Sequence, residues 1–299
     1  MRLFYLAGPL VFGGLFFSAR TGQAQSLVSG FMSGKGHGSV SVSATTESYQ
    51  QVFLVPEKVD GVPIFKEIQI NSVSLYASYG LTDKIEAVVT LPYIRSAGKA
   101  DNQALSNLGI SSATNVRGNL QDISGVLKFK GFSREIGASI LDLLGAVAVS
   151  TPIGNYKSEK SLDYIVAIGN RATKVSAIGV AHLKTASGIF ATGQAGYSLR
   201  SGNVPNAFLS EAKLGYAGRR IYLEGFANFQ LSDAKGTDIL QPGFDGDFTA
   251  TRVNFARVGV SFFRPIAKGL GVTLGVSQYV AGRNIGQSTA YSAGAAYSF

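Results

Sequence analysis

Apolar and polar residues alternate along most of this chain with a period of two. Within residues 221–231 the odd positions carry apolar side chains such as Leu223 and Phe229, and even positions include Glu224 and Asn228. Successive side chains of a β-strand point to opposite faces, so the pattern predicts a strand with one apolar and one polar face. The same alternation recurs down to the last residue, which predicts an all-β fold.

About 12 such segments can be counted, each long enough for the strands of roughly 10 residues that cross an outer membrane. Tight turns and mostly longer links alternate between them, so a barrel would collect the tight turns at its periplasmic end. The sequence therefore predicts a transmembrane antiparallel β-barrel of about 12 strands, with short periplasmic turns and longer extracellular loops. The strands are expected at 37–46, 70–80, 83–97, 120–131, 135–152, 171–184, 187–200, 206–217, 219–232, 249–264, 269–284 and 286–299. Tight turns are expected at 80–83, 131–135, 185–187, 217–218 and 265–268, and longer links at 47–69, 98–119, 153–170 and 233–248.

A soluble β-sandwich is the alternative fold, because antiparallel sheets with one wet face also alternate. Charged residues make up 15% of the chain, against about 25% in soluble domains. Most of the expected strands exceed the usual globular length of about 5–6 residues. Their polar faces carry Ser, Gly, Thr and Asn more than Lys and Glu, which suits a confined lumen. These features favour the membrane barrel.

The first residues have the composition of an export signal. Arg2 precedes an apolar run over 3–17, and the small residues Gly22 and Ala24 follow with one residue between them. This pattern predicts a cleaved signal peptide at 1–24 and a barrel at 37–299, in the outer membrane of a Gram-negative bacterium. A short N-terminal segment at 25–36 would lie between them. That segment could fold into the lumen or remain a disordered periplasmic tail.

One hairpin resembles a known family. The stretch from Ala77 to Tyr93 contains YGLTD followed by LPY, and it resembles the hairpin of outer-membrane transporters named for the meta-pathway of phenol degradation. Residues 122–130 and 146–156 look like the next two strands of that family. The resemblance implies an outer-membrane barrel that passes small organic molecules. It supplies no catalytic residue.

Charged and polar side chains on the inward faces are the candidate functional residues. Charges inside a membrane protein are costly unless they face water or each other, so they mark either a solute pathway or an ion-paired plug. Both alternatives are open at this stage. The candidate lumen-lining residues are Glu86, Lys128, Lys130, Asp142, Lys174, His182, Gln194, Glu211, Lys213, Glu224, Asn228 and Arg257.

Catalytic, cofactor and metal sites are not expected. The chain has no Cys and only two His, His37 and His182, so it offers no thiolate ligands and no paired His for a metal. A phospholipase-like barrel would need a Ser and a His on the lipid face, whereas the alternation turns His182 inward. The 27 basic residues are scattered along the chain, which argues against a nucleic-acid partner.

The sequence as a whole predicts a monomeric, porin-like barrel that acts as a passive channel for a small solute. The family resemblance implies a hydrophobic or aromatic solute. The alternative is a barrel that does not transport and instead presents loops such as 98–119. Expected partners are the lipids of the outer membrane and the barrel assembly machinery. The machinery would recognise Phe299, which ends the last alternating strand.

Overall fold

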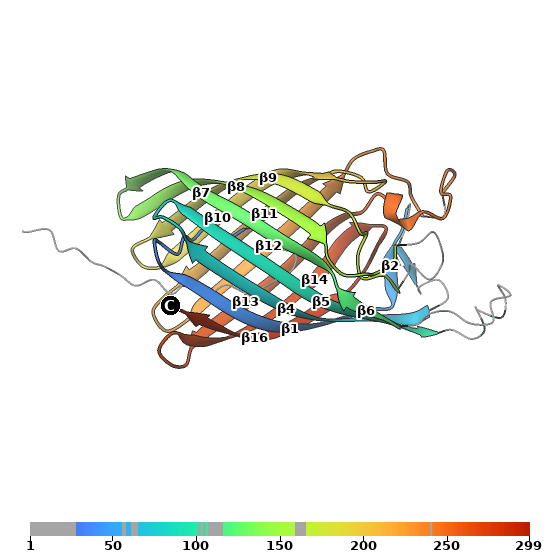
Figure 1. Ribbon diagram of the computed structural model, residues 1–299, viewed down its shortest axis with the longest axis horizontal. Coiled ribbons are helices and arrows are strands. Elements are labelled where there is room, and N and C mark those ends of the chain that lie inside the picture. Colours follow the sequence, from blue (N-terminus) through green and yellow to red (C-terminus); the bar gives the residue numbers. More distant parts are fainter. Residues whose placement is uncertain are drawn as a thin grey trace, which may run out of the picture.

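The computed structural model describes residues 28–55, 58–60, 65–100, 103, 106, 116–158, 166–239 and 241–299. The expected signal peptide lies outside these residues. Antiparallel strands form one closed barrel, and its chain end marked C lies at the same end as the tight turns (Figure 1). The barrel sheet has 13 strands, of which β6 and β7 follow one another beside β5, so twelve strands surround the lumen. The predicted fold class is confirmed.

The strands of the barrel are long. They are β1 (Gly38–Tyr49), β4 (Phe65–Gly80), β5 (Ile85–Ala100), β6 (Val116–Leu120), β7 (Asp122–Ile136), β8 (Ser139–Pro152), β9 (Lys174–Thr185), β10 (Ile189–Arg200), β11 (Ala207–Ala217), β12 (Tyr222–Ser232), β13 (Asn254–Pro265), β14 (Leu270–Arg283) and β16 (Thr289–Ser298). A second, small sheet of β2 (Gln51–Phe53), β3 (Lys58–Asp60) and β15 (Ile285–Gly286) lies at the opposite end from the tight turns (Figure 1). Within the described ranges no helix is long and apolar enough to span a membrane.

The barrel closes where β1 pairs with both β4 and β16. Val40 lies opposite Tyr297 on one side and Ala77 on the other. The backbones of Gly38 and Phe299 exchange two hydrogen bonds of 3.0 Å, which extend the seam to the last residue. Closure satisfies the backbone groups of both end strands, as a hydrocarbon environment requires. The first and last strands of the barrel therefore pair with each other.

The two faces of each strand have opposite exposure. On β1, Ser39 and Ser41 are buried, whereas the alternating Val40 and Val42 are 40% and 48% exposed. The exposed face is therefore the apolar one, which is the reverse of a soluble protein and is typical of a barrel in lipid. Pro92 has no N–H for the ladder of hydrogen bonds between strands. It lies on β5 at the point where β6 ends and β7 begins on the neighbouring side, and its carbonyl accepts a hydrogen bond from the backbone N–H of Gln121 between these two strands.

Some predicted boundaries were wrong. The expected turn at 131–135 lies inside β7, which continues to Ile136 through a bulge between Lys130 and Phe132. The chain turns one step later, because Gly137 adopts the left-handed conformation (φ 59°) that a tight turn needs. The links at 47–69 and 98–119 are also shorter than expected. β1 extends to Tyr49, β4 begins at Phe65 and β5 extends to Ala100.

Candidate functional site

Two cavities occupy the lumen. The larger has a volume of about 570 Å³, and its lining combines charged side chains such as Lys174 and Lys213 with apolar ones such as Val88 and Ile178. The smaller, of about 300 Å³, is lined mainly by hydroxyl-bearing and small side chains together with Arg257. Both volumes are within or near the range of about 300–1,000 Å³ of small-molecule sites.

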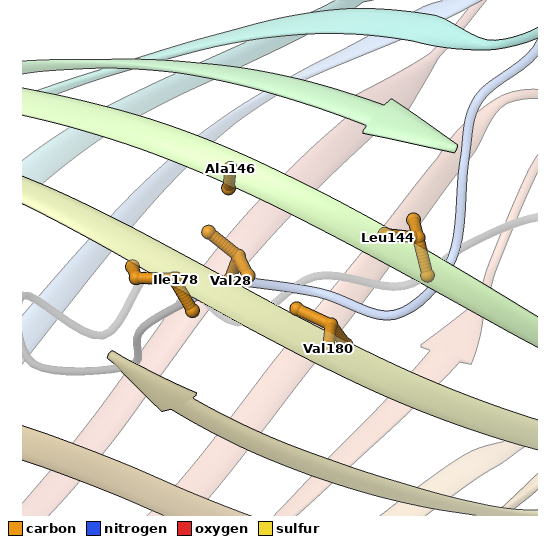
Figure 2. Packing of buried hydrophobic residues seen from close by; sticks show 5 residues of the cluster. All are labelled: Val28, Leu144, Ala146, Ile178 and Val180. Carbon is orange, nitrogen blue, oxygen red and sulfur yellow. The ribbon is translucent and has the colours of Figure 1, made fainter. Parts of the chain in front are cut away.

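Residues 28–36, which we call the N-terminal segment, enter the barrel from its tight-turn end, so that residues 28–34 are buried or partly buried whereas Lys35 and Gly36 are exposed. Figure 2 shows Val28 between β8, which carries Leu144 and Ala146, and β9, which carries Ile178 and Val180; all five side chains are buried. This position answers the question that the sequence left open, because the described part of the segment is folded into the lumen.

The backbone of Val28 is held by one side chain. Its N–H donates to Gln194 Oε1 at 3.1 Å, and its carbonyl accepts from Gln194 Nε2 at 2.9 Å. Gln194 lies on β10 and is buried. An amide side chain can pair with a backbone as another strand would, so Gln194 satisfies both polar groups of Val28 inside the barrel.

Phe31 is the centre of an aromatic cluster that crosses the lumen. Its ring centroid lies 4.4 Å from that of His182 and 5.0 Å from that of Phe190. It also packs on a buried group that contains Phe263 of β13 and Ala296 of β16. Because these residues lie near the ends of their strands that face the tight turns, the cluster obstructs the lumen at that end.

Charged groups hold the rest of the N-terminal segment. Lys128 Nζ donates to the carbonyl of Phe31 at 2.7 Å and lies 3.6 Å from Glu86 Oε2. The same carboxylate oxygen accepts from the backbone N–H of Ser33 at 2.8 Å. Both charged side chains are almost fully buried. A buried ion pair needs such additional hydrogen bonds to offset its desolvation, and here the N-terminal segment provides them.

A second ionic network lies on β11 and β12. Lys213 Nζ lies 3.2 Å from Glu211 Oε1 and 3.7 Å from Glu224 Oε1. Asn228 donates to Glu211 at 3.1 Å, and Gln194 donates to the same carboxylate. Gln194 therefore connects this network to Val28. The charges of this network are balanced by each other and by amide side chains, as buried polar groups generally are.

The remaining candidate residues also occupy inward positions, buried or partly buried. Lys174 pairs with Asp122 at 3.0 Å, and Lys130 with Asp142 at 3.8 Å. Arg257 Nη2 lies 3.9 Å from Glu47, and its guanidinium stacks over Tyr279, 5.0 Å from the ring centroid. The geometry brings all the candidates together in one lumen. That these residues take part in transport remains a prediction.

His182 does not face lipid. It is 2% exposed, and its Nδ1 forms a 2.7 Å hydrogen bond with the hydroxyl of Thr192 behind the ring of Phe31. A lipid-cleaving site on the barrel exterior would need this imidazole on the opposite face. Within the described residues no group of three or more His, Cys, Asp or Glu side chains could hold a metal ion.

The inner surface has two unlike walls. The charged wall is the inward face of β5 and β7–β12, and it carries all the candidate residues except Arg257. The hydroxyl wall is the inward face of β13, β14, β16, β1 and β4. Its small buried side chains include Ser39, Ser41, Ser43, Ser74, Ser78, Ser261, Thr273 and Ser277.

The sequence argument missed the aromatic cluster. Phe190, Tyr222 and Phe263 are buried at inward positions that alternation assigns to the polar face. Their common signal is an aromatic residue within a polar register close to a tight turn. That signal could have indicated a constriction at this end of the barrel.

No family model matches the chain, and no curated protein matches it in sequence. Among solved structures, an outer membrane channel from Pseudomonas putida F1 is 14% identical, with a TM-score of 0.69 over 94% of this chain and 100% of that chain. The translocator domain of the autotransporter NalP from Neisseria meningitidis is 11% identical, with a TM-score of 0.46 over 88% of each chain. The first likeness shows that the fold is that of an outer-membrane barrel. The resemblance to phenol meta-pathway transporters stays a prediction.

Proposed function

We propose that this protein is a passive channel of a bacterial outer membrane whose lumen is closed at rest by the N-terminal segment. One observation carries the proposal. The obstruction at the tight-turn end is made in large part by a terminal segment that enters from outside the barrel sheet, and not solely by side chains of the wall. A segment of this kind can leave while the wall stays intact.

The lining of the larger cavity supports a small, weakly charged solute. Its cations lie close to carboxylates, as Lys174 does to Asp122 and Lys213 to Glu224. Apolar side chains such as Val126 and Phe255 share the same cavity. Balanced charge argues against strong selection of ions by sign. A hydrophobic or aromatic solute fits the apolar part of the lining and the family resemblance.

A cysteine lock tests this function. A Cβ placed on Gly30 would lie 2.9 Å from the Cβ of His182, so a shift of about 1 Å would allow a disulfide between cysteines at these positions. The chain has no cysteine of its own. In the Gly30→Cys, His182→Cys variant, liposomes should swell in small solutes when the pair is reduced and stop swelling when it is oxidised.

The control is the single variant His182→Cys, whose swelling should not respond to the oxidant. Equal swelling of the oxidised and reduced double variant would contradict a mobile N-terminal segment. Absence of swelling in both states would favour the alternative of a barrel that only presents its outer loops.

A place in the outer membrane also implies which partners the protein has. We propose that the exposed apolar band contacts outer-membrane lipid and that the barrel works as a monomer. Phe299, with its side chain 50% exposed beside Tyr297, would be the residue that the assembly machinery recognises. Its backbone pairing with Gly38 supports such a role, because the residue recognised during assembly would also complete the seam.

A further inference from the structure

A groove of about 850 Å³ crosses the outer surface of the barrel, over the seam where β1 lies between β4 and β16. We call it the seam groove. Ala44 and Ala293 form its floor, Tyr93 and Arg95 of β5 border one side, and Tyr291 and Leu274 border the other. These side chains point away from the lumen, because each alternates with an inward-facing neighbour. The seam groove is therefore separate from the two lumen cavities.

Strand register places the seam groove at the edge of the apolar band. Ala44 is in line with Val73 on one side and with Ala293 and Leu274 on the other, all apolar. Two outward positions further along, Ser48 is in line with Gln69, Thr289 and Gln278, all polar. The groove thus begins where outward side chains change from polar to apolar.

Arg95 marks the end of the seam groove that faces away from the tight turns. It lies ten positions after Ile85, where β5 starts. For a strand tilted by about 45° this is a rise of roughly 25 Å, the height of the apolar band of an outer-membrane barrel. Arg95 is therefore expected at the level of the outer-leaflet headgroups.

The surroundings of Arg95 leave it open to a ligand. Its register partner on β6 is Gly118, and a Cβ at Gly118 would lie 2.8 Å from the Tyr93 hydroxyl and 3.7 Å from Arg95 Cβ. The missing side chain keeps both polar groups uncovered. Among the residues described, no carboxylate forms a salt bridge with exposed Arg95. A guanidinium in this position matches a phosphate in charge and in bidentate geometry.

We propose that the seam groove binds one phosphorylated lipid of the outer leaflet, with an acyl chain over Ala44 and Ala293 and a phosphate at Arg95. The small floor residues leave a depression that a chain fills, and Tyr93 and Tyr291 confine it from both sides. The proposal rests on the outer-membrane location proposed above. It does not depend on solute passage through the lumen.

Native mass spectrometry of the full chain in detergent, titrated with lipid A, tests the proposal. Arg95→Gln should weaken lipid A binding about tenfold or more, as the loss of a charge-assisted hydrogen bond does. Ala44→Leu, which fills the floor without a change in charge, should weaken it as well. The matched control is Arg264→Gln, since Arg264 is also exposed and outward but lies at the tight-turn end of β13, and it should bind as the wild type does.

Two results would overturn the seam groove as a lipid site. One is an unchanged affinity for lipid A in both Arg95→Gln and Ala44→Leu. The other is an equal loss in Arg264→Gln, which would show diffuse attraction to positive charge. Phosphatidylcholine should bind weakly to every form, and inorganic phosphate should not compete with lipid A. A folded barrel changes its gel mobility on heating. If Arg95→Gln does not show this change, lipid A binding by Ala44→Leu alone decides whether the seam groove is a lipid site. Liposome swelling of each variant is measured in parallel, so that a failure of the lipid-site proposal can be distinguished from a failure of the channel proposal.

Discussion

The charged wall and the hydroxyl wall enclose the same lumen but fill it differently. Val28, Phe31 and Ser33 form hydrogen bonds with three side chains of the charged wall, which are Gln194, Lys128 and Glu86. The hydroxyl wall contributes mainly small side chains, and at Gly259 it contributes none. Gly259 is the register partner of Phe226 on the neighbouring strand β12, and a Cβ on Gly259 would lie 2.4 Å from the Phe226 ring. Where the two walls join, a long side chain on one strand thus requires a short one on the next.

This difference shows how one twelve-strand barrel can bind a separate segment and still keep open space in its lumen. A smaller barrel is filled by its own wall, and a much larger one leaves a water channel. Here one wall binds a separate segment and the other leaves space. The comparison predicts which changes should open the lumen, which should destabilise the wall and which should have little effect.

Removing the segment that the charged wall binds should have the largest effect. Deletion of Gln25–Gly36 takes away Val28 and Phe31, so the lumen loses its obstruction at the tight-turn end. We expect single-channel conductance in planar bilayers to rise several-fold over a small, weakly selective wild-type value. Equal conductance of the two forms, with the deletion still folded by heat-modified gel mobility, would mean that the wall itself closes the pore.

Breaking the second ionic network should destabilise the charged wall. Lys213→Met leaves Glu211 and Glu224 buried without their cation, and removing one partner of a buried ion pair costs about 3–5 kcal/mol. On the hydroxyl wall Ser41→Ala should change stability little, because within the described structure the buried Ser41 hydroxyl has no hydrogen-bond partner. Urea-induced unfolding from lipid vesicles measures both. Similar losses of stability in Lys213→Met and Ser41→Ala would show that the two walls are equally constrained.

Adding volume to the hydroxyl wall should have an intermediate effect. Gly259→Ala places a Cβ 2.4 Å from the Phe226 ring and 2.6 Å from the backbone oxygen of Val276, and overpacking of this kind costs about 1–3 kcal/mol. Gly193→Ala is the matched control, because a Cβ at Gly193 would meet nothing within 4 Å. The same unfolding assay compares them. If the two variants are equally stable, the close contact between the walls contributes nothing to stability.

The smallest effect is expected at the outer rim, where the ion pair of Asp238 and Arg283 is only partly buried. The hydrogen bond from Arg283 holds the pKa of Asp238 below its ordinary value, which is about 3.9 for Asp. The ion pair therefore contributes its full stabilisation above the ordinary pKa of Asp, and this stabilisation is lost as the pH falls through the lowered pKa of Asp238. Hydrogen-exchange protection factors of the 233–239 backbone, which correct each rate for the intrinsic effect of pH, should fall slightly at pH 3 relative to pH 7. Asp238→Asn should remove this pH dependence.

Much of the barrel could be predicted from the sequence because alternation is a local property. A side chain such as Val40 or Ser41 faces lipid or lumen according to its parity within one strand, and twelve such strands can be recognised separately. The position of the turn after β7 was harder to predict from the sequence. Both Gly131 and Gly137 could reverse the chain, and the bulge after Lys130 decided in favour of Gly137.

Local alternation is enough to predict the membrane-barrel class, the approximate strands and the inward position of the candidate residues, since each follows from neighbours within about ten residues. The place of the N-terminal segment and the pairing of the inward charges follow from tertiary contacts instead. Val28 bonds to Gln194 across 166 positions, and Phe31 meets rings from β10 and β12. Such contacts depend on the curvature and register of the closed sheet, which bring distant residues together and leave no periodic signal along the chain.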